Sequence, residues 1–454
     1  MTHKPFIWIV MIFVLTACGS KNPGMSKEDA AKALVEQATQ VQTESEVTTV
    51  AVTDFPEGYM PPAGIKYEPK IVTTGAVVLN IQAALKNIRP MKVSELGKME
   101  IHRTGIETIT MLSRTGALTS VKEGYLLNAV QGLFLLKKDF QLAKQLFQNE
   151  VEISGGDMPF VNPKQMIYDV YYDSSCRQLR CTFIKISAEQ DKRKEYVVTL
   201  PFDALLDSDT PLKPEVVTSR LLIKLAGNSY AGMKGGFATS ALGMCSIYTF
   251  SANGDTLCRF KVGKSSDYES GSIPRTGERG KSYIYQNKTY FRMAYSNVLY
   301  HLEDASTLKA VYQLNFGTLK QATKKEVSSN QNINDLYFVE DWLESDRYLF
   351  ILLAKGYNCP DGRKEGIVSL YTLIYDKHSK VFFSLPPSKN KEVEFPVLKA
   401  DGAENLSFFP NFVVDGIPVM MLSGKELKKD CNKGLETLGL TDVSDKELFI
   451  VTVK

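Results

Sequence analysis

Trp342 and the acidic residues beside it are the first group whose residue types suggest chemistry. Glu340, Asp341 and Glu344 surround this tryptophan. An aromatic ring can cover the apolar face of a sugar while carboxylates bond its hydroxyl groups. A pair of carboxylates held about 5.5 or 6.5–9.5 Å apart can hydrolyse a glycosidic bond. This group therefore suggests a glycan site, with Trp342 and Glu340 as candidate ligand contacts.

A second interpretation of Trp342 is structural. Leu336, Phe338 and Trp342 stand at alternate positions of a strand-like run, and alternate positions of a strand share one face. We favour this interpretation, in which Trp342 belongs to the hydrophobic core.

A second candidate group lies between residues 275 and 300, where arginine and tyrosine are frequent. Its members are Arg275, Arg279, Tyr283, Tyr285, Tyr290, Arg292 and Tyr295. Both residue types are enriched among the side chains that dominate recognition surfaces. Alternating tyrosines also follow from the preference of aromatic residues for strands, and we favour that explanation. The candidate ligand contacts from this group are Arg275, Arg279, Tyr283 and Arg292.

Motifs for other chemistry are missing from the sequence. It contains no HExxH, GxSxG or Walker A motif, so we predict no catalytic residue, no metal site and no cofactor. The glycine-rich run 230–237 is followed by a strand-like run from Met244, whereas a phosphate site would need a helix there. Lys and Arg number 54 against 51 Asp and Glu, without a basic block. Nucleic-acid binding therefore has no electrostatic support.

The N-terminus predicts export and lipidation. A basic start is followed by the apolar run Phe6–Leu15, which is too short to span a bilayer core of ~30 Å as a helix. Small residues then precede Cys18, as in the bacterial lipobox, where the cysteine is acylated and becomes the new N-terminus. We predict a lipoprotein signal peptide over 1–17 and lipidation of Cys18; an ordinary cleaved signal is the alternative. Because 19–22 contains no acidic residue, we expect a lipid-anchored protein of the bacterial cell envelope that faces the periplasm.

The remaining chain divides into two parts. Residues 18–69 are rich in Lys, Glu, Thr, Ser and Gln and predict a flexible tether, with a possible short helix over 26–38. Residues 70–454 are rich in strand-like runs joined by turns. The Asn253–Gly254 pair is the clearest hairpin turn. It sets Cys258 opposite Thr249 and leaves Cys245 about 13 Å away along the strand, too far for a disulfide. Cys176 and Cys181 could still meet across a turn.

Repeated antiparallel units over ~385 residues predict an all-β fold, a six-bladed β-propeller with about 64 residues per blade. Two packed β domains are the alternative. The body also resembles the six-bladed β-propeller lipoproteins of Bacteroidota, which share the shape of NHL and TolB-type propellers. The resemblance is carried by segments 93–96, 124–127, 133–136, 297–300, 312–317 and 448–454. It implies that 448–454 closes the ring beside an N-terminal strand. Segment 153–159 departs from the expected Gly-Gln-Gly-Pro-like turn.

These observations predict a binding or scaffolding module of the cell envelope. Its partners would be the membrane, through the N-terminal lipid, and a glycan, a peptide or an envelope protein. The main alternative is a propeller-fold enzyme, such as a glycoside hydrolase or lyase, which requires acids converging at the channel mouth. A purely structural envelope component is a third possibility and would present a large exposed apolar patch.

Overall fold

The computed structural model describes most of the chain from residue 67 onward. The described residues are 67–107, 117–154, 160–187, 192–207, 215–218, 223–224, 229–233, 246–251, 255–261, 281–286, 288–292, 295–323, 326, 333–356, 366–387, 395–399, 406–431, 435 and 439–454. Strands dominate, and the four α-helices within these ranges are short: α2 (Ile81–Lys86), α3 (Val93–Leu96), α4 (Phe202–Leu206) and α7 (Gly424–Asp430). In this part of the chain, no helix is long and apolar enough to cross a membrane. Cys18 and the segments 26–38 and 234–245 lie outside the described residues.

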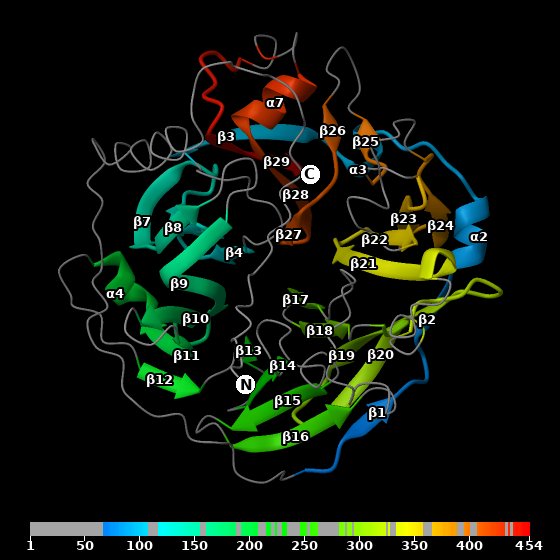
Figure 1. Ribbon diagram of the computed structural model, residues 1–454, viewed down its shortest axis with the longest axis horizontal. Helices are drawn as coiled ribbons and strands as arrows, with labels where there is room; N and C mark the ends of the chain where they lie inside the picture. Colours follow the sequence, from blue (N-terminus) through cyan, green and yellow to red (C-terminus); the bar gives the residue numbers. More distant parts are fainter. Residues whose placement is uncertain are drawn as a thin grey trace, which may run out of the picture.

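The strands form a β-propeller, in which sheets follow one another around a ring (Figure 1). Five blades consist of strands that are consecutive along the chain. The first blade contains β4 (Ala117–Val121), β5 (Gly124–Ala129), β6 (Gly132–Leu136) and β7 (Leu142–Gln148). The second blade contains β8 (Glu150–Ser154), β9 (Phe160–Asp173), β10 (Gln178–Ser187), β11 (Lys192–Pro201) and β12 (Glu215–Thr218). The third blade contains β13 (Ile223–Lys224), β14 (Ser229–Met233), β15 (Ser246–Ser251) and β16 (Thr256–Lys261). The fourth blade contains β17 (Lys281–Tyr285), β18 (Lys288–Arg292), β19 (Val298–Leu302) and β20 (Thr307–Asn315). The fifth contains β21 (Tyr337–Glu344), β22 (Tyr348–Lys355), β23 (Ser369–Asp376) and β24 (Val381–Ser384).

A composite sheet from both ends of the described chain closes the ring. Its strand order is β27-β28-β29-β3, with bounds β27 (Phe412–Val414), β28 (Ile417–Ser423), β29 (Glu447–Val453) and β3 (Met99–Glu107). The antiparallel β29–β3 pair confirms that the segment 448–454 lies beside an N-terminal strand. We predicted six repeated blades, but the structure has five blades of consecutive strands. The closing sheet does not repeat this pattern, because it is assembled from segments that are distant in the sequence. The strands β25 (Leu398–Lys399) and β26 (Ser407–Phe408) form a separate small sheet.

The hairpin between β15 and β16 has the predicted register from Ser246 to Thr249, and the register shifts at Phe250, which pairs with Thr256. Thr249 is the partner of Cys258, and the Cys258 thiol is free and buried. Burial raises the pKa of this thiol to about 11, so it is protonated at neutral pH. Cys176 and Cys181 are not joined by a disulfide, so the structure gives no support to that pairing.

Aspartates begin several of the hairpin turns, because their carboxylates accept hydrogen bonds from nearby backbone amides. Asp173 accepts from the amide of Ser175 at 3.0 Å and Asp304 from that of Ser306 at 2.7 Å. Asp376 accepts from the amide of His378 at 3.0 Å. His378 therefore lies in the turn between β23 and β24.

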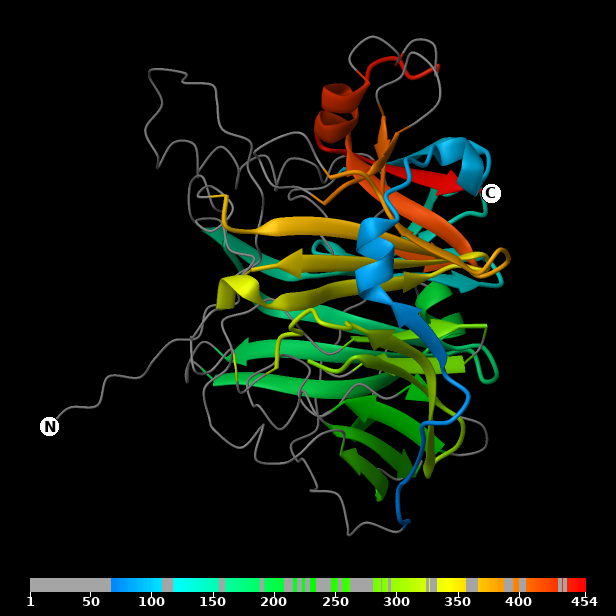
Figure 2. The ribbon, with the colours of Figure 1, turned by 90° about the vertical axis from the view of Figure 1, so that its right-hand side faces the viewer.

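Residues 67–98, which we name the strap, run along the outer edges of neighbouring sheets (Figure 2). The strap first bonds to β16, where the amide of Tyr67 donates to the carbonyl of Leu257 at 2.7 Å. Its strands β1 (Lys70–Val72) and β2 (Val77–Asn80) both pair in parallel with β20. Helix α2 then packs on β24, before isolated bridges join the strap to residues 384 and 399. One segment thus covers the rim of several sheets.

The hydrophobic core is divided into clusters between adjacent sheets. The cluster beneath the strap contains Leu79 and Ile81 of the strap together with Leu299 of one blade and Leu349 of the next, all at most 2% exposed. Because apolar burial is the main stabilising contribution to folding, the strap is part of the core structure of these blades.

Candidate functional site

The two candidate groups from the sequence meet at the interface between the blades β17–β20 and β21–β24. The Tyr283 hydroxyl, in β17, donates a hydrogen bond to Glu344 Oε2, in β21, at 2.8 Å. Arg292, in β18, donates from Nη1 to the carbonyl of Val339 at 3.2 Å. These contacts connect neighbouring blades.

Most of the described candidate contacts are buried in this interface. Trp342 and Arg292 are each 1% exposed, and Trp342 packs in the core cluster beneath the strap. The core interpretation of Trp342 therefore agrees with the structure, and a ligand contact by Trp342 or Arg292 stays a prediction. Glu340 is partly buried on β21. Arg275 and Arg279 lie outside the described residues, and their ligand contacts stay predictions.

A buried polar network centred on Glu344 occupies this interface. Glu344, whose side chain is 3% exposed, accepts hydrogen bonds at Oε1 from the Tyr312 hydroxyl at 2.8 Å and from Lys377 Nζ at 3.1 Å. Lys377 Nζ also donates to the Tyr285 hydroxyl at 3.0 Å and lies 4.5 Å from the centre of that ring. We call Tyr283, Tyr285, Tyr312, Glu344 and Lys377 the interblade network.

The chemistry of the network is structural. Burial raises the pKa of Tyr283 and Tyr312 above the ordinary value, and the charge of Glu344 raises both further. The two phenols are therefore protonated hydrogen-bond donors at neutral pH. Each of these phenols donates a hydrogen bond to Glu344, and the Tyr283 and Tyr312 bonds tie the two blades together.

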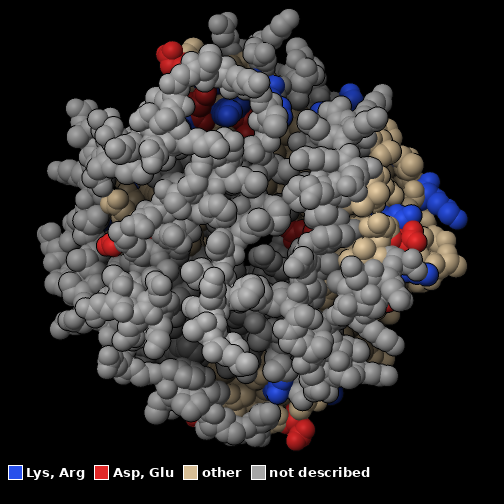
Figure 3. All heavy atoms as spheres, viewed as in Figure 1, with Lys and Arg blue, Asp and Glu red and all other residues tan. Residues whose placement is uncertain are grey.

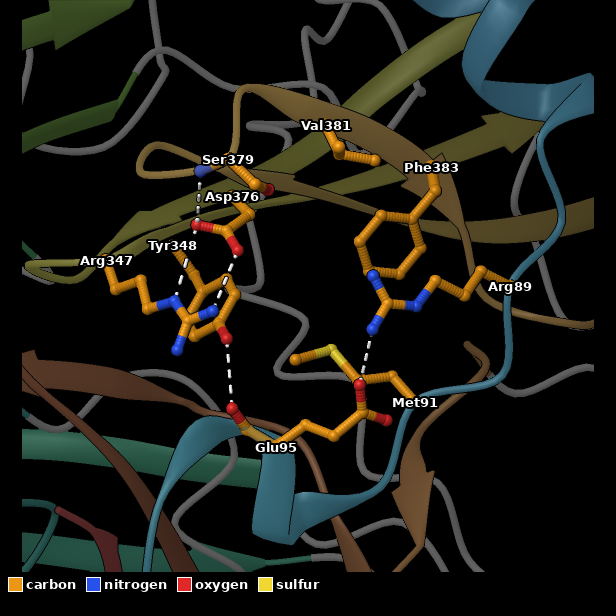
Figure 4. A pocket seen from close by; sticks show the side chains of 9 residues that line it. All are labelled: Arg89, Met91, Glu95, Arg347, Tyr348, Asp376, Ser379, Val381 and Phe383. Atoms are coloured by element: carbon orange, nitrogen blue, oxygen red, sulfur yellow. Dashed lines mark hydrogen bonds and ion pairs between the residues drawn. The ribbon is translucent and has the colours of Figure 1, made fainter.

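A cavity of about 400 Å³ lies between the strap and the blade β21–β24 (Figure 4). It is within the size range of small-ligand sites, about 300–1,000 Å³. It is lined by Arg89, Met91, Glu95, Arg347, Tyr348, Asp376, Ser379, Val381 and Phe383. We call this cavity the two-arginine pocket.

Each arginine of the pocket is held by a carboxylate and by an aromatic ring. Arg347 Nη2 lies 3.0 Å from Asp376 Oδ2, and its guanidinium lies 4.9 Å from the centre of the Tyr348 ring. Arg89 pairs with Glu95 and lies 5.1 Å from the centre of the Phe383 ring. Both arginine side chains are nevertheless 47% exposed. They are fixed in place and still open to a ligand.

Electrostatics hold the carboxylate of Asp376 in its charged form. Burial alone would raise the pKa of Asp376, but hydrogen bonds from Arg347 and from the amides of His378 and Ser379 outweigh burial and lower this pKa to about 2. Asp376 is therefore ionised at neutral pH and cannot serve as a general acid there. Its part in the pocket is to orient Arg347.

The pocket lies outside both candidate groups from the sequence. Arg89 comes from the strap, whereas Arg347 ends the turn between β21 and β22. The turn-opening Asp376 could be recognised from the sequence, but no spacing rule connects Arg89 with Arg347. Within the described residues, no group of three or more His, Cys, Asp or Glu side chains could hold a metal ion.

The fold and the pocket define a β-propeller with an open rim cavity that is lined by two arginine–carboxylate pairs. A family described as "Domain of unknown function (DUF4933)" matches residues 62–433. The chain belongs to this DUF4933 family.

Solved structures support the fold. A protein of Bacteroides fragilis NCTC 9343 that is assigned as exported has a TM-score of 0.54 and 12% sequence identity, over 84% of this chain and 99% of the other. A DUF4221 family member from Bacteroides vulgatus ATCC 8482 has a TM-score of 0.36 and 10% identity, over 78% of this chain and 96% of the other. The first TM-score shows that the Bacteroides fragilis protein and this chain share a fold, and nothing further. The second TM-score is too low to support a conclusion. A search of curated proteins returns no match.

Proposed function

We propose that this chain is an extracytoplasmic, lipid-anchored β-propeller of the cell envelope that acts as a binding or scaffolding module. Its ligand is a glycan, a peptide or an exposed part of an envelope protein. The observation that carries the proposal is the two-arginine pocket. Two guanidinium groups that are already oriented lose little freedom when a ligand binds.

Binding is favoured over catalysis by the state of the carboxylates in the pocket. Glycoside hydrolysis needs one carboxylic acid that keeps its proton near neutral pH. Glu95 and Asp376 are each paired with an arginine, and the pKa of Asp376 is lowered to about 2, since hydrogen bonds outweigh its burial. A glycoside hydrolase or lyase on this fold stays the alternative, and it would need acids elsewhere, such as at the channel mouth.

Replacing Arg347 with alanine is expected to weaken ligand binding at least tenfold, about the loss of one charged hydrogen-bonding group. The measurement is a titration of glycans, peptidoglycan fragments and peptides, followed by melting temperature and by chromatography for products. Arg259→Ala is the matched control, because Arg259 also lies over a tyrosine ring, that of Tyr248 at 5.4 Å, but outside the pocket. Equal losses in both variants would remove the pocket from the proposal, and new products would favour the enzyme.

Replacing Cys18 with alanine is expected to move the protein from the membrane fraction to the released fraction, since acylation needs the thiol. Fractionation of cells followed by a high-salt wash measures this change. A Cys18→Ala protein retained as fully as the unaltered protein after the wash would contradict the lipid anchor.

A further inference from the structure

The strap exposes apolar side chains that ordinary packing would bury. Seven large hydrophobic residues are exposed in the described part of the chain, and five belong to the strap: Tyr67, Ile71, Val77, Val78 and Ile88. Val78 and Ile88 are the most open, at 58% and 55%. The strap runs the length of one side of the molecule (Figure 2), so these side chains follow the rim. Concentration of apolar surface on one side marks an interaction surface.

The strap is also basic. Lys70, Lys86, Arg89, Lys92 and Lys98 face only two acids within it, Glu68 and Glu95. Arg89 pairs with Glu95, and Lys98 pairs with Glu100 of β3. Lys70, Lys86 and Lys92 are spread along the strap, and all are exposed. Basic side chains project from the right-hand margin of Figure 3, where the strap lies in the view of Figure 1.

We propose that the strap is a docking surface for an anionic lipid membrane, so that the propeller lies with this rim against the bilayer. Apolar side chains would enter the boundary between headgroups and acyl chains while lysines meet the acidic headgroups. The inference rests on the proposed function for its cellular setting, but the surface can be tested without the anchor.

Charge favours a membrane over a second copy of the chain. A twofold dimer places the same patch opposite itself, so the basic straps would face each other. Like charges across an interface disfavour association. An anionic bilayer is instead complementary to the lysines. Glu303 and Asp304 lie in the turn before β20, next to the start of the strap, and they limit the basic surface at that end.

The test is sedimentation of residues 19–454 with lipid vesicles, because this form contains every described residue and lacks Cys18. We expect binding to vesicles of phosphatidylethanolamine with phosphatidylglycerol to exceed binding to phosphatidylcholine vesicles at least fivefold, and to fall as salt screens the lysines. The double variant Val78→Glu and Ile88→Glu should lower binding about tenfold. Ile367→Glu is the control, since Ile367 is 43% exposed and lies outside the strap.

Three results would overturn the inference. They are absence of vesicle binding, an equal loss in Ile367→Glu, and a dimer that the strap variant dissociates without any change in vesicle binding. The last result would assign the strap to a second copy. A strap variant that still binds the pocket ligand but no longer binds vesicles would show that the strap and the two-arginine pocket act independently.

Discussion

Replacing Glu344 with alanine should lower the free energy of unfolding by about 3–5 kcal/mol, the usual cost of breaking a buried ion pair. The carboxylate is 3% exposed and accepts hydrogen bonds from Tyr283, Tyr312 and Lys377. Its loss leaves the Lys377 ammonium, 17% exposed, without its carboxylate partner and removes a connection between two blades. Denaturant unfolding followed by far-ultraviolet circular dichroism measures the change.

The control for Glu344 is an exposed ion pair. Asp335 Oδ1 lies 3.8 Å from Lys355 Nζ, with side chains 66% and 39% exposed. Asp335→Ala should therefore cost less than about 1 kcal/mol. A Glu344→Ala protein as stable as Asp335→Ala would show that the interblade network contributes no stability.

Tyr290, which lies beside the interblade network, should make the stability of the protein depend on pH. Burial and the charge of Glu344 raise the pKa of Tyr290, whose ring stacks on that of Tyr283, to about 12. The unfolded chain has the ordinary tyrosine pKa near 10, so it loses this proton at lower pH than the folded chain does. The contribution of Tyr290 to stability is thus complete below about pH 10 and decreases as pH rises towards about 12. Tyr290→Phe should flatten the decline, and an unchanged profile would assign it to other groups.

Ending the chain at Lys446 should abolish cooperative folding, because the truncation removes all of β29. All seven residues of β29 are buried, and the strand pairs with β28 on one side and with β3 on the other. Its removal exposes two sheet edges and a strip of the core around Phe449 and Val451. We expect no thermal transition in scanning calorimetry.

Two variants test this role of β29 at single-residue scale. Ile450 is 0% exposed, so Ile450→Asp buries an unpaired carboxylate and should destabilise severely. Ile450→Val keeps the apolar character and should cost about 0.5–1.5 kcal/mol. A truncated chain that melts like the complete one would show that the ring does not depend on β29 for closure.

Several elements could be predicted from the sequence because they depend on neighbours along the chain. Alternating apolar residues with turn residues predicted the all-β class, and the Asn253–Gly254 pair in the sequence predicted that Cys258 lies opposite Thr249, which is the observed pairing. The hydrogen-bonding reach of Asp376 determined its turn. The apolar segment at the C-terminus identified the closing strand through the family resemblance. Hairpin geometry is local, and a chemical pattern of a few residues therefore specifies it.

Only the tertiary structure decided which distant residues meet. Trp342 could be a ligand platform or a core residue until the packing of two blades buried it. Tyr283 and Glu344 belong to separate segments of the sequence, and the blade interface joins them. The strap likewise brings Arg89 to the blade that carries Arg347. The sequence determined the strands and hairpins, whereas the number of blades and the contacts between blades and along the rim depend on how whole sheets pack around the ring, which no local spacing encodes.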